Sequence, residues 1–277
     1  GNYGGGGMRN YSSDVTLINC SFLDNTSEYG GAIFNEYYSN STITNCSFLG
    51  NIGRQVGGAI YNTNVSSINT TNCSFSGNSA SDYGGGIYNL YTLPNKIINC
   101  NFLGYSASNY GGGVCNRNSP TTITNCSFSG NSAGFYGGGI YNFESSPTIT
   151  NCSFSGNSAG NSGGGVYSSI YSNPTLTNCI LWGNSSSIEN DQSSNNITYS
   201  NVQGGYAGAG NINIDPLFVS APSYTSAPFI IGDYQLQVCS PAINTGRSAS
   251  IPAGITNDLA GNPRKYNSSI VDMGAYE

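Results

Sequence analysis

The sequence predicts an all-β fold: a right-handed parallel β-helix, a solenoid with about 26–27 residues per rung, followed by an irregular C-terminal β cap. The first observation is a series of Asn-Cys pairs that recur every 26 or 27 residues, at Cys20, Cys46, Cys73, Cys100, Cys126, Cys152 and Cys179. The second is an apolar series on the same period, each member after two or three glycines, at Ile33, Ile60, Ile87, Val114, Ile140 and Val166. The third is composition: Gly, Asn, Ser and Thr dominate and the apolar residues are β-branched or aromatic, which excludes helix and favours strands.

Each repeat holds about three short strand candidates separated by Gly or Asn corners, as in one coil of a parallel β-helix. Neighbouring coils are expected to lie about 4.8 Å apart, so seven coils extend roughly 30 Å. Crossovers between parallel strands are overwhelmingly right-handed, which sets the predicted winding.

The stretch from Thr122 to Phe128 indicates which side chains face inward. Phe128 and Cys126 share one strand parity, whereas Ile123 has the other, so all three are interior only if the chain turns between them. Asn125 stands at that point, and Asn tolerates the left-handed conformation of a sharp corner. We therefore predict bends, with a ladder of stacked amides, at Asn19, Asn45, Asn72, Asn99, Asn125, Asn151 and Asn178.

In the glycine-rich strand, Ile140 is predicted to point inward and Tyr141 outward. The outward series comprises Phe34, Tyr61, Tyr88, Cys115, Tyr141 and Tyr167. Two interpretations stay open for these aromatics: they stabilise the sheet by stacking on their equivalents, or they offer a surface on which sugars stack.

The seven cysteines of the series are predicted to be small buried thiols rather than metal ligands, with Cys115 and Cys239 outside the series. The strand spacing is longer than a disulfide favours, and oxidation of some adjacent pairs stays open as the alternative. The chain has no His and no C-x-x-C pair, so neither a metal nor a cofactor is expected.

Two regions are predicted: β-helix repeats over 1–184 and a capping region over 185–277, in which residues 196–202 could add one more rung. Met8 takes the Ile place of the repeat, so Gly1 already lies inside the pattern. We interpret the start as processed or cut, with an open first rung that is a template for a second chain.

Charge excludes several functions. A formal net charge of −6 argues against nucleic acid, and no segment reaches the roughly 20 apolar residues that membrane insertion by a helix needs. The six acids of residues 1–184 share no rung position, and they are Asp14, Asp24, Glu28, Glu36, Asp82 and Glu144. Asp215, Asp258 and Asp272 are the weak candidates for catalysis, but these three side chains suit hydrogen bonds to turn amides better, so no catalytic residue is predicted. Together with Asp233 they are weak candidates for a structural Ca²⁺ site.

Two resemblances follow from motifs. GGAIFN at residues 30–35, GGAIYN at 57–62 and GGGIYN at 84–89 and 137–142, each paired with F-x-x-N, resemble the repeats of chlamydial polymorphic outer-membrane proteins and of other bacterial β-helix surface proteins. The series ILWGN (180–184), NINIDPLF (211–218), GDYQL (232–236), SPAINTG (240–246), DLAGNPR (258–264) and VDMGAYE (271–277) resembles the C-terminal region of choice-of-anchor Q proteins.

These resemblances imply a secreted bacterial protein at the cell surface, and we expect a non-enzymatic role, structural or adhesive. Self-association head to tail into extracellular filaments is one form of this role, since a repeated heterologous contact builds a fibre. A carbohydrate-binding adhesin fragment that recognises surface glycans is the alternative, and a polysaccharide lyase or hydrolase is the weakest of the three.

Overall fold

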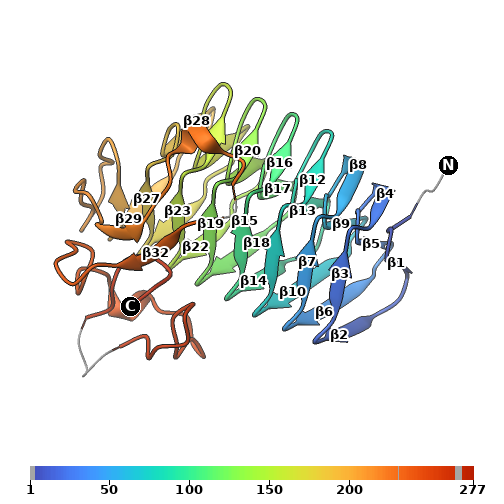
Figure 1. Ribbon diagram of the computed structural model, residues 1–277, viewed down its shortest axis with the longest axis horizontal. Coiled ribbons are helices and arrows are strands. Elements are labelled where there is room, and N and C mark those ends of the chain that lie inside the picture. Colours follow the sequence, from blue (N-terminus) through green and yellow to red (C-terminus); the bar gives the residue numbers. More distant parts are fainter. Residues whose placement is uncertain (1–3, 230, 266–269) are drawn as a thin grey trace.

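The computed structural model describes residues 4–229, 231–265 and 270–277, and the chain winds through them as a stack of coils seen edge-on in Figure 1. Three eight-stranded sheets and one six-stranded sheet, which we call sheets A to D, run along the stack, and a two-stranded sheet E lies beside it. All neighbours in sheets A to D pair parallel, so the predicted parallel β-helix is confirmed.

Sheet A contains the strands after the glycines: β1 (Met8–Tyr11), β5 (Ile33–Glu36), β9 (Ile60–Thr63), β13 (Ile87–Leu90), β17 (Val114–Arg117), β21 (Ile140–Phe143), β25 (Val166–Ser169) and β28 (Ile188–Asp191). Sheet B contains the strands before the cysteines: β2 (Val15–Ile18), β6 (Asn40–Thr44), β10 (Ser67–Thr71), β14 (Asn95–Ile98), β18 (Thr121–Thr124), β22 (Thr148–Thr150), β26 (Thr175–Thr177) and β29 (Asn196–Thr198). Sheet C contains the strands after them: β3 (Ser21–Leu23), β7 (Ser47–Leu49), β11 (Ser74–Ser76), β15 (Asn101–Leu103), β19 (Ser127–Ser129), β23 (Ser153–Ser155), β27 (Ile180–Trp182) and β30 (Asn201–Val202).

Sheet D was not predicted and is a fourth side of the coil: β4 (Thr26–Tyr29), β8 (Ile52–Val56), β12 (Ser79–Ala80), β16 (Ser106–Ala107), β20 (Ser132–Ala133) and β24 (Ser158–Ala159). Four of its strands have only two residues, too few to show an alternating pattern in the sequence. The remaining elements are β31 (Phe218–Ser220) and β32 (Asp233–Leu236), which form sheet E, and two 3-10 turns, η1 (Tyr224–Ser226) and η2 (Ser248–Ser250).

The coils stack with equivalent residues directly opposite one another. Phe102 of β15 pairs with Phe75 and Phe128, and the six phenylalanine rings from Phe22 to Phe154 stack with centroids 4.6–5.0 Å apart. Such offset stacking adds to the area that each ring buries. The cysteines from Cys46 to Cys179 are buried free thiols in a parallel column, as predicted, and Cys20 is half-buried.

The asparagine corners are confirmed, because all seven predicted residues have φ between +51° and +57°. Their amide ladder is only partly confirmed. Asn99 Nδ2 donates to Asn72 Oδ1 and Asn125 Nδ2 to Asn99 Oδ1, both at 3.0 Å, but no bond joins Asn125 to Asn151. At this point Asn125 Nδ2 also donates to the carbonyl oxygen of Asn257 in the C-terminal region, at 2.7 Å.

Two other amide ladders run through the interior. On sheet A each Asn donates to its equivalent in the next coil, from Asn10 to Asn142, at 2.6–3.0 Å. The Asn of the F-x-x-N motif forms the second ladder, in which Nδ2 donates to Oδ1 of the equivalent Asn in the next coil at 2.8–2.9 Å. Tyr105 replaces one of them, and its hydroxyl accepts from Asn78 Nδ2 at 3.3 Å. Buried amides are thereby satisfied by their own copies.

The glycine pairs allow the backbones of neighbouring coils to approach closely. A Cβ on Gly112 would lie 2.3 Å from the carbonyl oxygen of Gly138, whereas on Gly113 the closest atom would be at 2.7 Å. Ala32 and Ala59 occupy the second of these positions in other coils, and no coil has Ala at the first.

We expect Gly112→Ala to lower the free energy of unfolding by about 1–3 kcal/mol through overpacking against backbone atoms. Gly113→Ala is the matched control and should cost less, because its Cβ meets one backbone oxygen at 2.7 Å rather than at 2.3 Å and other coils carry Ala at this position. Chemical denaturation of both variants compares them, and an equal loss would contradict the assignment of close approach to Gly112.

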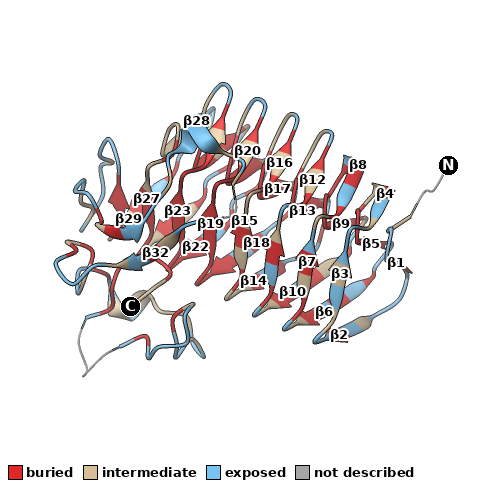
Figure 2. Ribbon diagram, in the orientation of Figure 1, coloured by how far each residue is buried: buried red, intermediate tan, exposed pale blue. Residues whose placement is uncertain are grey.

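Of the two interpretations of the aromatic series on the outer face of sheet A, stacking on equivalent rings fits the structure, because most of the series is buried and stacked. Phe34, Tyr61, Tyr88 and Tyr141 are less than 9% exposed. A second row covers them, formed by Tyr29, Val56, Tyr83, Tyr110 and Tyr136 at the end of sheet D. Tyr83 stacks on Tyr88 at 5.3 Å, so the rows form an aromatic cluster outside the coil. In Figure 2 the strands β9 and β13, which carry Tyr61 and Tyr88, are mostly in the colour of buried residues.

Regular pairing continues through β28, β29 and β30 as far as Val202, so the suggested extra rung at 196–202 is present. Only a short segment covers the end of the stack: Tyr206 packs on the core, and Ile212 bridges to Asn201. The rest of the C-terminal region runs back along the outside of sheet C, where β32 and the C-terminus lie beside β19 and β22 in Figure 1. The predicted cap is therefore mostly a lateral cover.

Candidate functional site: a polar cleft beside the C-terminal loop

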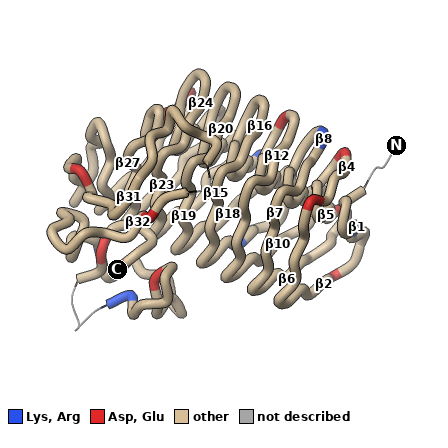
Figure 3. Tube along the Cα trace, viewed as in Figure 1, with Lys and Arg blue, Asp and Glu red and all other residues tan. Residues whose placement is uncertain are grey.

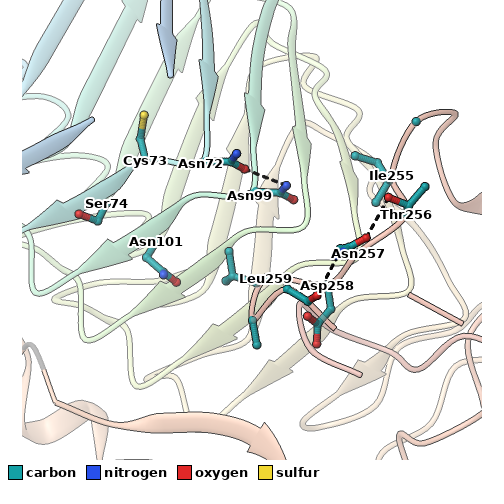
Figure 4. Close-up of a pocket in the computed structure, with 13 residues that line it drawn as sticks. Asn72, Cys73, Ser74, Asn99, Asn101, Ile255, Thr256, Asn257, Asp258 and Leu259 are labelled. Atoms are coloured by element: carbon teal, nitrogen blue, oxygen red, sulfur yellow. Dashed lines mark hydrogen bonds between the residues drawn. The ribbon is translucent and has the colours of Figure 1, made fainter. Parts of the chain in front are cut away.

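A cleft of about 540 Å³ lies where the C-terminal region meets the side of the β-helix (Figure 4). One wall consists of the corners between sheets B and C in two neighbouring coils, and the other is the loop 254–261. The lining residues are Asn72, Cys73, Ser74, Asn99, Asn101, Gly254, Ile255, Thr256, Asn257, Asp258, Leu259, Ala260 and Gly261.

The wall that the β-helix forms presents amide and hydroxyl groups, one set from each coil. The turns at Asn72 and Asn99 place these side chains outside the coil, joined by their hydrogen bond. Ser74 and Asn101 follow two residues later and are direct partners in sheet C, so their side chains lie one above the other. Both are accessible, because Ser74 is exposed and Asn101 half-buried.

The loop wall is held in place by hydrogen bonds. Asn257 accepts from Asn125 through its carbonyl oxygen, and its Nδ2 donates to the carbonyl oxygen of Gly261 at 2.8 Å. Leu259 N donates to the carbonyl oxygen of Ala275 at 2.9 Å. The loop thus rests on a corner of the β-helix and on the C-terminal segment 270–277, which preorganises the cleft.

Asp258 is the one carboxylate in the lining, and it is 2% exposed. Its oxygens accept from Asn262 N at 2.7 Å, Asn262 Nδ2 at 3.1 Å and Glu277 N at 2.9 Å. A glycoside hydrolase needs a pair of carboxyl groups across the scissile bond. The lining instead suits hydrogen bonding to a neutral polar ligand, with Ile255 and Leu259 as apolar contacts.

The other sequence-predicted aspartates do not join this cleft. Asp215 accepts from Leu217 N at 2.9 Å, closing its own turn as expected, and Asp233 does the same with Gln235 N at 3.0 Å. Asp272 accepts from Asn244 N at 2.7 Å. In the described parts of the chain, no three of His, Cys, Asp and Glu come together as a metal site. Figure 3 shows charged residues scattered over the tube rather than gathered.

Below the cleft, Arg264 is 1% exposed and faces Glu277, with Nε 3.5 Å from Oε1. Burial raises the pKa of the Glu277 carboxyl to about 7, and burial also raises the pKa of Asp272, while Arg264 opposes both shifts and Asp258 adds to them.

Because both folded-state pKa values lie above those of the unfolded chain, the neutral carboxyls favour docking, and this stabilisation is lost as the pH rises from about 4 to about 7. Amide exchange of Gly274 and Ala275, which donate to Asn178 O and Ser153 Oγ, measures the docking. We expect their protection factors to fall with rising pH, and constant protection would contradict this assignment.

Comparisons with known proteins agree with the fold. Residues 95–211 match the family described as right handed beta helix region, which supports the predicted winding. Residues 19–36 and 72–90 match the Chlamydia polymorphic membrane protein repeat, and these segments include GGAIFN and GGGIYN. No curated protein matches the chain.

Among solved structures, a trypsin-treated form of QnrB1, a plasmid-mediated fluoroquinolone resistance protein, is 14% identical over 76% of this chain and 92% of its own, with a TM-score of 0.27. This similarity is too low to carry an argument. The sheet topology and the family match over residues 95–211 together define the fold of the chain as a right-handed parallel β-helix. Two of its repeats are similar to the repeat of chlamydial polymorphic membrane proteins.

The sequence analysis predicted the corners at Asn72 and Asn99 but not the cleft beside them. It identified DLAGNPR (258–264) as a motif of a resemblance, without a position in the fold. Nothing in the pattern places residues 254–261 against Asn99, since the contact joins segments more than 150 residues apart. The similarity to choice-of-anchor Q proteins matches none of these comparisons and stays a prediction. No helix in the described ranges is long and apolar enough to span a membrane.

Proposed function

We propose that the chain is a non-enzymatic, secreted surface protein whose β-helix is a rigid support and whose polar cleft binds neutral glycans. The carrying observation is the lining of the cleft: amides and hydroxyls in register, and one carboxylate that already accepts three hydrogen bonds within the protein. Rows of such groups suit the hydroxyls of a sugar chain, and the apolar loop residues suit the faces of its rings. Repeats of a surface-protein class support the location.

A glycan array with the purified chain tests this proposal, followed by calorimetry with the best neutral oligosaccharide. The variant Ser74→Ala/Asn101→Ala should weaken binding by about tenfold, since each lost hydrogen bond to a ligand contributes roughly 0.5–1.5 kcal/mol. The matched control is Ser21→Ala/Ser47→Ala, which changes the same column outside the cleft. Equal binding by both variants would contradict the assignment, and cleavage of the glycan would contradict the non-enzymatic role.

Filament assembly is the other proposal for a surface role, and it rests on the stacking of identical coils along one axis. Electron microscopy of the purified chain distinguishes the two. Head-to-tail filaments support self-association, whereas single rods that bind glycans support the adhesive role alone.

A further inference from the structure

The outer aromatic row of sheet A has one gap, at Cys115. Cys115 pairs with Tyr88 on one side and Tyr141 on the other, so a thiol stands where the neighbouring coils have a ring. The row stacks at 5.2 Å between Tyr61 and Tyr88 and at 5.9 Å between Tyr141 and Tyr167. Between Tyr88 and Tyr141 the ring of one coil is missing.

A pocket of about 140 Å³ lies at this gap, and Cys115, which is fully buried, belongs to its lining. The other lining residues are Tyr83, Tyr110, Arg117, Tyr141 and Phe143. Tyr110 is tilted by 38° against Tyr141 at 4.9 Å, so ring surfaces form much of the lining. A cavity of about 150 Å³ accepts one benzene ring, so the pocket has room for a single six-membered planar ring.

Arg117 adds a positive charge to the aromatic lining. Its guanidinium carbon lies 4.9 Å from the centroid of the Phe143 ring, and its Nε is buried with no hydrogen-bond partner. Among the described residues, no carboxylate lies within ion-pair distance of Arg117. A guanidinium that lacks an anion recognises carboxylates well, through charge-assisted hydrogen bonds.

We propose that this pocket binds a small aromatic acid, whose ring takes the place of the missing tyrosine ring and whose carboxylate pairs with Arg117. This binding site lies on sheet A and is separate from the polar cleft, so it goes beyond the proposed glycan binding. The ligand binds non-covalently, because burial raises the pKa of the Cys115 thiol and keeps it protonated.

Calorimetry and ligand-observed NMR with 4-hydroxybenzoate test the proposal, with 4-methylphenol as the neutral probe of the same ring. We expect saturable binding of 4-hydroxybenzoate, about tenfold tighter than that of 4-methylphenol, since the difference is one charge-assisted contact. Arg117→Gln should remove that preference, and Arg54→Gln, on the exposed part of β8, is the matched control.

Cys115→Tyr should abolish binding of both probes and leave the melting temperature equal or higher, because it completes the stack. If this variant does not fold, Cys115→Met fills part of the gap and provides the same comparison. No saturable binding by the unchanged protein, or unchanged binding by the variant that fills the gap, would overturn the proposal. Binding of 4-methylphenol as tight as that of 4-hydroxybenzoate would overturn the role of Arg117.

Discussion

Asn116→Asp is expected to lower the free energy of unfolding by about 3 kcal/mol or more at neutral pH, from the change of one amide to a carboxyl. Asn116 is fully buried in the amide ladder of sheet A. Its Oδ1 accepts from Asn89 Nδ2 at 3.0 Å, and its Nδ2 donates to Asn142 Oδ1 at 3.0 Å. An aspartate keeps the shape and the acceptor but loses the donor, so two oxygens face each other in a fully buried site.

The pH dependence of this variant follows from its burial. Desolvation would raise the folded-state pKa of the new carboxyl above about 4, its unfolded value, so the loss of stability should grow as the pH rises. Urea unfolding at several pH values measures it. The control is Asn69→Asp on the exposed side of β10, which should change stability little. Equal losses of stability in the two variants would contradict the stabilising role assigned to the interior amide ladder.

Phe128→Ala is expected to lower the free energy of unfolding by about 3–5 kcal/mol, because it removes a fully buried ring from the middle of a continuous stack. Phe128 lies 4.6 Å from Phe102 and 4.8 Å from Phe154, so both neighbours lose a partner. The parallel strand pairing fixes the backbones of the adjacent coils, so they cannot collapse into the space that the ring leaves, and a cavity remains.

Phe135→Ala is the control for this variant, because Phe135 is 44% exposed in the same coil. We expect it to change the free energy of unfolding by no more than about 0.5 kcal/mol. Denaturant unfolding followed by tyrosine fluorescence compares the two, and a small effect at Phe128 would contradict the assignment of the phenylalanine column to the core.

The interior of the coil could be predicted from the sequence because the same local conflict recurs in every repeat. Phe128 and Ile123 have opposite parity, and only a turn at Asn125 places both inside; the structure has that turn in all seven copies. The side of sheet D could not be predicted, since Ser132 and Ala133 are too few to form a pattern.

The burial of the outer tyrosines was missed although a signal was present. Tyr83, Tyr110 and Tyr136 precede the glycines at the period of the repeat, so a second row of rings could have been placed over the first. The C-terminal region offers no such period. Its position depends on single contacts, such as Ala275 N to Ser153 Oγ at 3.0 Å, which a pattern of residue types does not specify.

A two-histidine copper site tests the register of the coils most directly, because the chain has no His of its own. Lys96 and Thr122 are exposed direct partners in sheet B, about 4.8 Å apart, whereas Thr148 lies one coil further. Calorimetry with Cu²⁺ should show that Lys96→His/Thr122→His binds at least about tenfold tighter than either single variant or than Lys96→His/Thr148→His. Equal affinity in the adjacent pair and the single variants would contradict the stacking of equivalent residues on which the fold and both proposed sites depend.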